Sequence, residues 1–312
     1  MTSGEPLVSV NVPCYRQLDL SRRALESIRA QSFTNLEITL LDDGASDEYL
    51  SYVASLGDPR VVYRRNPERL GAMRNMFAAI QTGRGRYSMA FHEDDLLSAG
   101  YVEEAVDILE SHPRCAFVAC EVHEFDSEPA ATELAGRAPH PAFDVFASGA
   151  DFVRGILRGV NPMFGSVVYR REALEHAHAD LERFSTLADR PYLLSIMNRG
   201  WSAAVLREPM VWYRHHGDGD RRHEAMTVDH ILRLLRAYRD GLPERWTKPD
   251  QALYFSYSGY WLFELYRLTP AGSRPPVWQF LLRAWREGLY DPRARGRFGL
   301  RQIQRALLNR TS

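Results

Sequence analysis

Short apolar runs typical of buried strands alternate with amphipathic helical segments through the first 120 residues of the chain. The sequence predicts strands at residues 7–12, 36–41, 60–63, 87–91 and 115–119, separated by helices at 18–31, 47–56, 70–81 and 101–110. This alternation favours a parallel α/β sheet with right-handed crossovers. Helical segments dominate after about residue 222, so we place a boundary between an α/β domain of residues 1–222 and a helical region of residues 223–312.

The middle of the chain interrupts the alternation. Residues 121–147 lack a clear period and are rich in acids, prolines and alanines. We predict a long connection or flap there, which in a compact domain often has a function. Order returns with predicted helices at 150–158 and 189–199 and predicted strands at 165–170 and 201–206.

The composition excludes several classes of protein. A formal net charge of -1, with 45% hydrophobic and 25% charged residues, is typical of a soluble globular protein. Bulk electrostatics therefore give no reason to expect nucleic-acid binding. Cys14, Cys115 and Cys120 form no C-x-x-C pair, so we expect neither a disulfide framework nor a zinc site. The sequence shows no signal-peptide pattern and no stretch of membrane-spanning length, and we expect a cytoplasmic enzyme.

The apolar run that begins at Tyr87 ends in three consecutive acids, Glu93, Asp94 and Asp95. Adjacent carboxylates repel one another unless a positive group lies among them. At the carboxyl end of a parallel strand, that group is often a divalent cation that carries a phosphorylated substrate. Considered alone, the cluster is explained more simply as a solvated acidic turn. The choice between that turn and a metal site therefore depends on motifs elsewhere in the chain.

Polar and aromatic residues also follow the first two predicted strands. Tyr15 could stack on a nucleotide base, and Asp42 or Asp43 could accept hydrogen bonds from it. Arg74 and Asn75 lie in the third predicted helix and could face the same nucleotide. Simpler explanations exist for most of them: ordinary packing for the tyrosine, a tight turn for the two aspartates and an exposed salt bridge for the arginine.

Taken in order, these segments resemble the inverting family-2 glycosyltransferases with the GT-A fold. The resemblance covers residues 7–217. Its motifs are Val10-Asn-Val-Pro-Cys-Tyr15, Asp42-Asp-Gly-Ala-Ser-Asp47, Asn66, Gly71, Met73-Arg-Asn75, His92-Glu-Asp-Asp95, Asn161-Pro162, Val168-Tyr-Arg-Arg171, Leu187-Ala-Asp189 and Tyr213-Arg-His-His216. Each motif alone is weak, and their common order carries the identification. The resemblance implies a Rossmann-like nucleotide-diphospho-sugar transferase fold, with a central mixed sheet flanked by helices and a C-terminal helical extension.

The acid cluster corresponds to the metal-binding segment of that family. The resemblance implies Asp95 as the best metal ligand, with Asp94 contacting the donor ribose or the metal. Mn²⁺ or Mg²⁺ suits oxygen ligands and would neutralise a leaving diphosphate. The family pattern ends in a histidine, which makes His215 or His216 a further candidate ligand. Family members often carry aspartate where this chain has His92, and the sequence does not explain that histidine.

The resemblance also implies a catalytic base and a donor site. Asp189 corresponds to the acid that deprotonates the acceptor hydroxyl as it attacks the anomeric carbon. The family commonly has a second acid where Ala188 stands here. Because Pro191 follows, Asp189 could also be a helix N-cap, and the two roles are compatible. The implied nucleotide-sugar site consists of Pro13, Tyr15, Asp42, Asp43, Arg74, Asn75 and Asp94.

The implied function is a metal-dependent inverting glycosyltransferase that acts by single displacement. It would move a sugar from a UDP- or dTDP-activated donor to a carbohydrate, lipid-linked or small-molecule acceptor, in the biosynthesis of a polysaccharide, glycoconjugate or natural product. A nucleotidyltransferase and a non-catalytic sugar-nucleotide or carbohydrate-binding protein stay open as alternatives. The helices after residue 222 end in a basic segment, residues 283–310. We expect them to cover the acceptor side, to form a homodimer contact or to lie on the inner face of a membrane.

Overall fold

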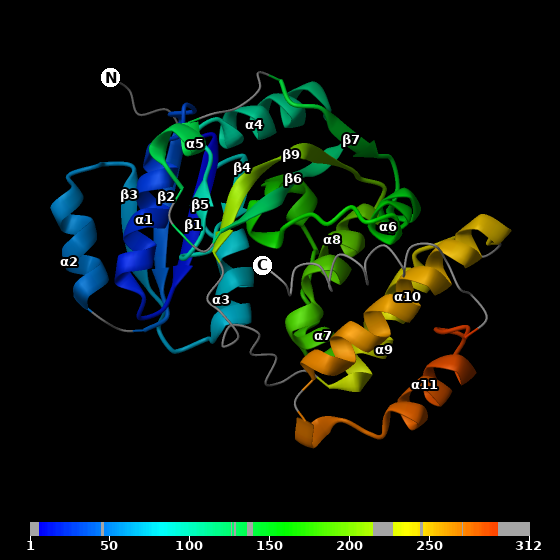
Figure 1. Ribbon diagram of the computed structural model, residues 1–312. Helices are drawn as coiled ribbons and strands as arrows, with labels where there is room; N and C mark the ends of the chain where they lie inside the picture. Colours follow the sequence, from blue (N-terminus) through cyan, green and yellow to red (C-terminus); the bar gives the residue numbers. More distant parts are fainter. Residues whose placement is uncertain are drawn as a thin grey trace. The chain divides into compact units, whose positions relative to one another are not determined.

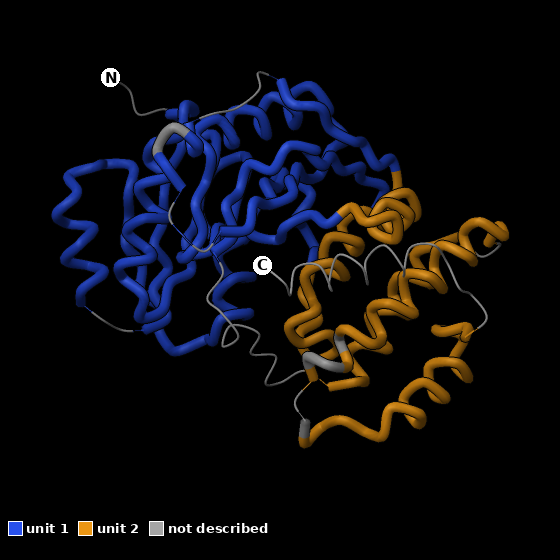
Figure 2. Tube along the Cα trace, viewed as in Figure 1, with its two compact units in different colours: residues 1–147, 161–177, 199–217 blue, residues 148–160, 178–198, 218–312 orange. Residues whose placement is uncertain are grey.

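A computed structural model describes residues 6–44, 47–125, 127, 129–135, 140–214, 227–243, 246–269 and 271–292. The chain forms two compact units, coloured separately in Figure 2. Unit 1 contains residues 1–147, 161–177 and 199–217, and unit 2 contains residues 148–160, 178–198 and 218–312. The boundary expected near residue 222 lies outside the described residues. Two segments that precede it belong to unit 2, because their helices pack with the C-terminal helices.

Unit 1 is built on a mixed sheet (Figure 1). Its strands are β1 (Val8–Cys14), β2 (Leu36–Asp42), β3 (Val61–Arg65), β4 (Tyr87–Ala90), β5 (Leu96–Leu97), β6 (Cys115–Phe125), β7 (Phe143–Phe146), β8 (Val168–Arg170) and β9 (Ser202–Arg214). The order across the sheet is β3-β2-β1-β4-β8-β6-β9-β5, and β7 also pairs with β9. Strands β1 to β4 pair in parallel, whereas β8 is antiparallel to both β4 and β6. The predicted α/β class with a central mixed sheet is confirmed.

The helices of unit 1 match the periodic segments of the sequence. They are α1 (Leu18–Arg29), α2 (Asp47–Leu56), α3 (Ala72–Gln81), α4 (Tyr101–Ser111) and the short α5 (Ala131–Ala135). Val8, Val10 and Val12 of β1 are fully buried, and so are Leu25 and Ile28 of α1. A central parallel strand covered on both faces needs this run of small branched side chains. The first 120 residues therefore fold as their pattern predicts.

The prediction of a long connection or flap at residues 121–147 is wrong, because regular elements occupy much of this stretch. Strand β6 continues to Phe125, and α5 and β7 follow within the same stretch. Strand β9 likewise continues to Arg214, well beyond the predicted end at Leu206. The two long strands pair with each other through a register shift between Cys120 and Val122. Pairing with a distant strand supplies the order that the local period of the sequence does not show.

Unit 2 is helical among its described residues. Its helices are α6 (Gly149–Leu157), α7 (Leu181–Phe184), α8 (Asp189–Met197), α9 (Val228–Asp240), α10 (Lys248–Leu268) and α11 (Val277–Arg286). The apolar stripe of α9 is buried: Ile231, Leu232, Leu235 and Tyr238 are fully inaccessible to solvent. Among the described helices, none combines the length with the apolar composition that crossing a bilayer requires.

Candidate active site

The carboxyl ends of β1, β2 and β4 lie at one edge of the sheet, because these three strands are parallel. Two backbone hydrogen bonds join the segments that follow them. The amide of Asp43 donates to the carbonyl of Cys14 at 2.9 Å, and the amide of Tyr15 donates to the Glu93 carboxylate at 2.9 Å. Ligands of open α/β sheets bind at such an edge. The structure therefore brings together three of the motifs identified in the sequence.

Beyond the end of β4, three side chains form a group that could hold a metal ion. One ligand atom from each of His92, Asp94 and Asp95 lies within 4.8 Å of the others. His92 Nδ1 lies 3.0 Å from Asp95 Oδ2, and the other oxygen of this carboxylate accepts a hydrogen bond from the Arg214 amide at 3.0 Å. His92, which the sequence left unexplained, is thus a direct partner of the best candidate ligand. Only the tertiary fold places Arg214 there.

This donor set fits a divalent cation. Asp95 is almost completely buried, with 1% of its surface exposed. Burial raises the pKa of the Asp95 carboxyl, and the hydrogen bond with His92 opposes that rise. A cation among the side chains would favour the charged carboxylates and offset the repulsion between Asp94 and Asp95. Carboxylate oxygens are the ligands that Mg²⁺ and Mn²⁺ prefer, and an imidazole nitrogen is a common additional ligand for transition metals.

Glu93, the first of the three acids, has a different environment. Its carboxylate accepts hydrogen bonds from the Tyr15 amide at 2.9 Å, the Ser21 hydroxyl at 2.6 Å and the Tyr49 hydroxyl at 3.0 Å. Burial raises the pKa of this carboxyl, and these three hydrogen bonds oppose the rise. Glu93 therefore ties the end of β1 and helix α1 to the acid cluster, and its oxygens are directed to protein partners.

Gly165 is required beside His92. A Cβ atom added at Gly165 would lie 3.1 Å from His92 Nδ1 and 3.2 Å from two ring carbons. Such a contact would force the ring to move by a few tenths of an ångström. The glycine in the turn at Phe164–Ser166 therefore leaves space for the imidazole that contacts Asp95.

Asp43, at the end of β2, organises the loop that precedes α3. Its Oδ1 accepts hydrogen bonds from Asn66 Nδ2 at 2.9 Å and the Leu70 amide at 2.7 Å. Its Oδ2 accepts from the Gly71 amide at 2.8 Å. Asn75, on α3, is buried and bonds to the same Asn66 side chain at 2.8 Å. In this structure both Asp43 and Asn75 shape the loop, a role that motif spacing did not reveal.

Asp42 and Tyr15 lie at the same edge. Asp42 is fully buried and accepts hydrogen bonds from the Gly44 amide at 2.7 Å and the Tyr63 hydroxyl at 2.8 Å. Both contacts are made by protein groups, and the fully buried carboxylate presents no surface to a ligand in this structure. The ring of Tyr15 is partly exposed, and the guanidinium of Arg69 lies 4.5 Å from its centroid.

The remaining predicted residues of the donor site are placed as follows. Pro13 lies in β1 and is partly exposed, opposite Leu41 of β2. Arg74 is exposed on α3. His215 and His216 lie outside the described residues, so their predicted role stays a prediction.

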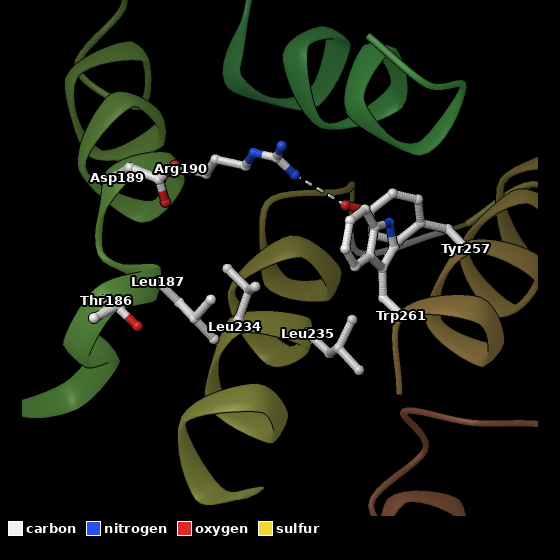
Figure 3. A pocket seen from close by; sticks show the side chains of 8 residues that line it. All are labelled: Thr186, Leu187, Asp189, Arg190, Leu234, Leu235, Tyr257 and Trp261. Atoms are coloured by element: carbon white, nitrogen blue, oxygen red, sulfur yellow. Dashed lines mark hydrogen bonds between the residues drawn. The ribbon is translucent and has the colours of Figure 1, made fainter. Parts of the chain in front are cut away.

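Asp189 belongs to unit 2, whereas the acid cluster belongs to unit 1. It is the first residue of α8, and Ala188 occupies the N-cap position without a side-chain capping bond. The interpretation of Asp189 as the N-cap is therefore wrong, although an acid in the first turn still suits the helix dipole. Figure 3 shows its side chain on the wall of a pocket formed by α8, α9 and α10.

A mixed α/β sheet with an acidic segment at the carboxyl edge of its parallel strands is the arrangement of the GT-A class of glycosyltransferases. The chain belongs to glycosyl transferase family 2, whose family model matches residues 9–177. The predicted family, fold and class of enzyme, a glycosyltransferase, are confirmed. The matched region ends before Asp189, so the position proposed for catalysis lies beyond it.

Known proteins agree with this assignment. An uncharacterized glycosyltransferase of Rickettsia typhi is 30% identical over 104 residues, which are 33% of this chain and 32% of that protein. The chain thus spans about a third of the length of the curated relatives it matches. Staphylococcus aureus TarS, solved with UDP, aligns with a TM-score of 0.56 at 12% identity, over 80% of this chain and 70% of TarS. The mannosyltransferase PcManGT of Pyrobaculum calidifontis, solved with GDP-Man and Mn²⁺, aligns with a TM-score of 0.52 at 17% identity, over 99% and 88% of the two chains. At these identities the likeness concerns the fold.

Proposed function

We propose that the protein is a metal-dependent inverting glycosyltransferase that uses a nucleoside-diphosphate sugar. The observation that carries the proposal is the group formed by His92, Asp94 and Asp95 at the edge where β1, β2 and β4 end. Solved proteins of the same fold bind UDP, UDP-GlcNAc or GDP-Man. We keep a UDP- or dTDP-sugar as the expected donor, with GDP-sugars as the alternative that the fold also accommodates.

The residues of unit 1 would bind the donor. Tyr15 offers a partly exposed ring on which a base can stack. Asp42 would accept hydrogen bonds from the base once the turn that buries its carboxylate opens. Asp43 and Asn75 would act by holding the loop before α3, and Arg74 is accessible to the phosphates.

Asp94 and Asp95 would hold Mn²⁺ or Mg²⁺, and His92 would orient the Asp95 carboxylate through its 3.0 Å contact. When bound, such a cation offsets the negative charge of the leaving diphosphate.

Asp189 would act as the general base. The acceptor hydroxyl oxygen attacks the anomeric carbon, and its proton passes to the Asp189 carboxylate. The bond between that carbon and the diphosphate oxygen breaks, and its electron pair leaves on the nucleoside diphosphate. Attack from the face opposite the leaving group inverts the anomeric centre.

The test combines donor screening with one substitution. A thermal-shift screen of UDP-, dTDP- and GDP-sugars with Mn²⁺ identifies the donor, and the product of turnover is then measured. We expect Asp189→Asn to lower turnover by at least about 10³-fold while the donor dissociation constant changes less than about twofold. Asp240→Asn, a change of an exposed aspartate in the same unit, is the matched control. Normal turnover by Asp189→Asn would overturn the assignment of the base.

The same assay separates the alternatives. A nucleotidyltransferase would release pyrophosphate, whereas a glycosyltransferase releases a nucleoside diphosphate. A non-catalytic binding protein would bind the donor without transfer or slow donor hydrolysis.

We also propose that α11 mediates peripheral membrane contact. Trp278 and Trp285 lie seven residues apart on this helix and are 63% and 56% exposed, and Arg286 beside them is exposed as well. Exposed tryptophans with adjacent arginines are typical of helices that lie on anionic membrane surfaces. Sedimentation with vesicles containing phosphatidylserine should decrease when both tryptophans are replaced by serine. If the intact protein does not sediment and instead dimerises through this face, the homodimer alternative is correct.

A further inference from the structure

The pocket that contains Asp189 is built entirely within unit 2 (Figure 3). Leu187 lines it from the 3-10 turn at Ser185–Leu187, Asp189 from the start of α8, and Leu234 and Leu235 from α9. Trp261 of α10 completes the wall, and in Figure 3 its indole lies at the end of the pocket away from the aspartate. Three helices that are distant in sequence thus enclose one carboxylate and one indole.

The arrangement of α8 and α10 is fixed by a buried polar contact. Arg190 NH1 donates a hydrogen bond to the Tyr257 hydroxyl at 3.2 Å. The Tyr257 ring in turn lies 5.9 Å from the Trp261 ring, between centroids. The arginine next to the predicted base therefore positions the aromatic wall of the same pocket, and we assign Arg190 and Tyr257 as positioning residues.

The size of the pocket limits its occupant. Its volume is about 220 Å³. An apolar cavity of about 150 Å³ is sufficient for benzene. One six-membered ring with a small substituent therefore fits, and because the pocket is open to solvent, the rest of a larger acceptor would extend outside it.

The chemistry of the wall limits the occupant further. Leucine side chains offer no hydrogen bonds, and an indole offers a flat apolar face. Thr186, Arg190 and Tyr257 also line the pocket, but most of the surface that it presents is apolar. A sugar ring that carries a hydroxyl at nearly every carbon would therefore leave those that face Leu187, Leu234 and Leu235 without partners, which is unfavourable. A ring with one hydroxyl directed to Asp189 and apolar atoms elsewhere matches this wall.

We propose that this pocket binds the ring that carries the reacting hydroxyl of the acceptor, and that this ring is an apolar one, aromatic or alicyclic. The proposal rests on the proposed function of Asp189 as the base, and it names the acceptor class as a hydroxylated hydrophobic small molecule. Trp261 is then a specificity-determining residue, because its indole face contacts the ring.

Binding to the pocket can be measured without any turnover. Ligand-observed NMR titrations with phenol, cyclohexanol and methyl β-glucopyranoside report the dissociation constant of each probe. We expect phenol and cyclohexanol to bind the wild-type protein and methyl β-glucopyranoside to bind at least tenfold more weakly. Trp261→Ala should raise the dissociation constant of phenol about fivefold or more, and Trp261→Phe should restore most of the affinity. Phe263→Ala removes an exposed aromatic side chain of the same helix that does not line this pocket, and it should leave probe binding unchanged.

Each outcome decides the proposal. It is overturned if methyl β-glucopyranoside binds more tightly than the apolar probes, if none of the probes binds, or if Trp261→Ala and Phe263→Ala behave alike. Melting curves of both variants show whether a loss of binding reflects unfolding, and in that case the Trp261→Phe titration decides. Donor binding and donor hydrolysis are measured on the same samples. A protein that binds phenol in the pocket but never binds or hydrolyses a nucleotide sugar would contradict the proposed function and leave the pocket assignment standing.

Discussion

Replacing Glu93 separates the structural acid of the cluster from the two proposed metal ligands. The carboxylate of Glu93 accepts three hydrogen bonds, from Tyr15, Ser21 and Tyr49, at 2.6 to 3.0 Å. Hydrogen bonds to a charged group contribute about 1.5–3 kcal/mol each. The unfavourable burial of the carboxylate, which also raises its pKa, offsets part of that sum. We therefore expect Glu93→Ala to lower the free energy of unfolding by about 3–5 kcal/mol.

The measurement is thermal and urea unfolding followed by far-UV circular dichroism. For a unit of this size, a loss of about 3–5 kcal/mol lowers the melting temperature by roughly 10 °C. Glu93→Gln keeps the contact with the Tyr15 amide and should lower the unfolding free energy by about 1–2 kcal/mol.

Asp94→Ala is the matched control, because it removes the neighbouring acid. We expect it to change the unfolding free energy by less than about 1 kcal/mol and to weaken Mn²⁺ binding, measured by isothermal titration calorimetry, by at least tenfold. Equal melting temperatures for Glu93→Ala and Asp94→Ala would refute the division of roles. So would a Glu93→Ala protein of normal stability that has lost Mn²⁺.

Two further predictions concern unit 1. The hydrogen bonds from Arg60 hold the pKa of the Asp58 carboxyl below its usual value of about 3.9, so this carboxylate stabilises the fold above that pH and the contribution is lost as the pH falls further. Asp58→Asn should therefore lower the free energy of unfolding at pH 7 by about 1–2 kcal/mol, measured as a lower urea midpoint. The difference in unfolding free energy between the variant and the wild type should narrow below about pH 4, and a difference that does not change with pH would contradict this cause. Gly165→Ala should displace the His92 ring and weaken Mn²⁺ binding about tenfold. Gly272→Ala is the control, because an added Cβ there meets no atom within 4 Å, and it should leave Mn²⁺ binding unchanged. Equal Mn²⁺ affinities of the two variants in calorimetry would reject the role of Gly165.

Much of unit 1 was predictable from local pattern. The valines of β1 indicate a short strand followed by a helical segment, and the repeated alternation of such strands with helices predicted the parallel sheet. The motifs after β1, β2 and β4 were expected to bind one nucleotide sugar, and the parallel pairing of these strands brings them to one edge of the sheet. The extents of β6 and β9 were not predictable, since each is stabilised by pairing with the other across some 90 residues of chain.

At the site, too, the roles of some side chains were predictable from the sequence and the roles of others were not. The resemblance to family 2 implied Asp94 and Asp95 as ligand candidates, whereas residue type and position at a strand end indicated only an acid cluster. Residue type could not distinguish Glu93 from them, since three adjacent acids look alike until the backbone directs one of them toward Ser21 and Tyr49.

The sequence by itself determined the family, the alternation of strands and helices, and the edge of the sheet at which the acids gather. These features depend on local period and on residue type at strand ends, which a linear pattern records. Only the tertiary structure decided that His92 contacts Asp95, that Gly165 must be small, and that Asp189 shares a pocket with Trp261. The contacts of Gly165 with His92 and of Asp189 with the pocket of Trp261 join segments that are distant in sequence, and the orientation of His92 toward Asp95 depends on the backbone around it. All three depend on packing, whose free energy depends on every neighbouring side chain at once.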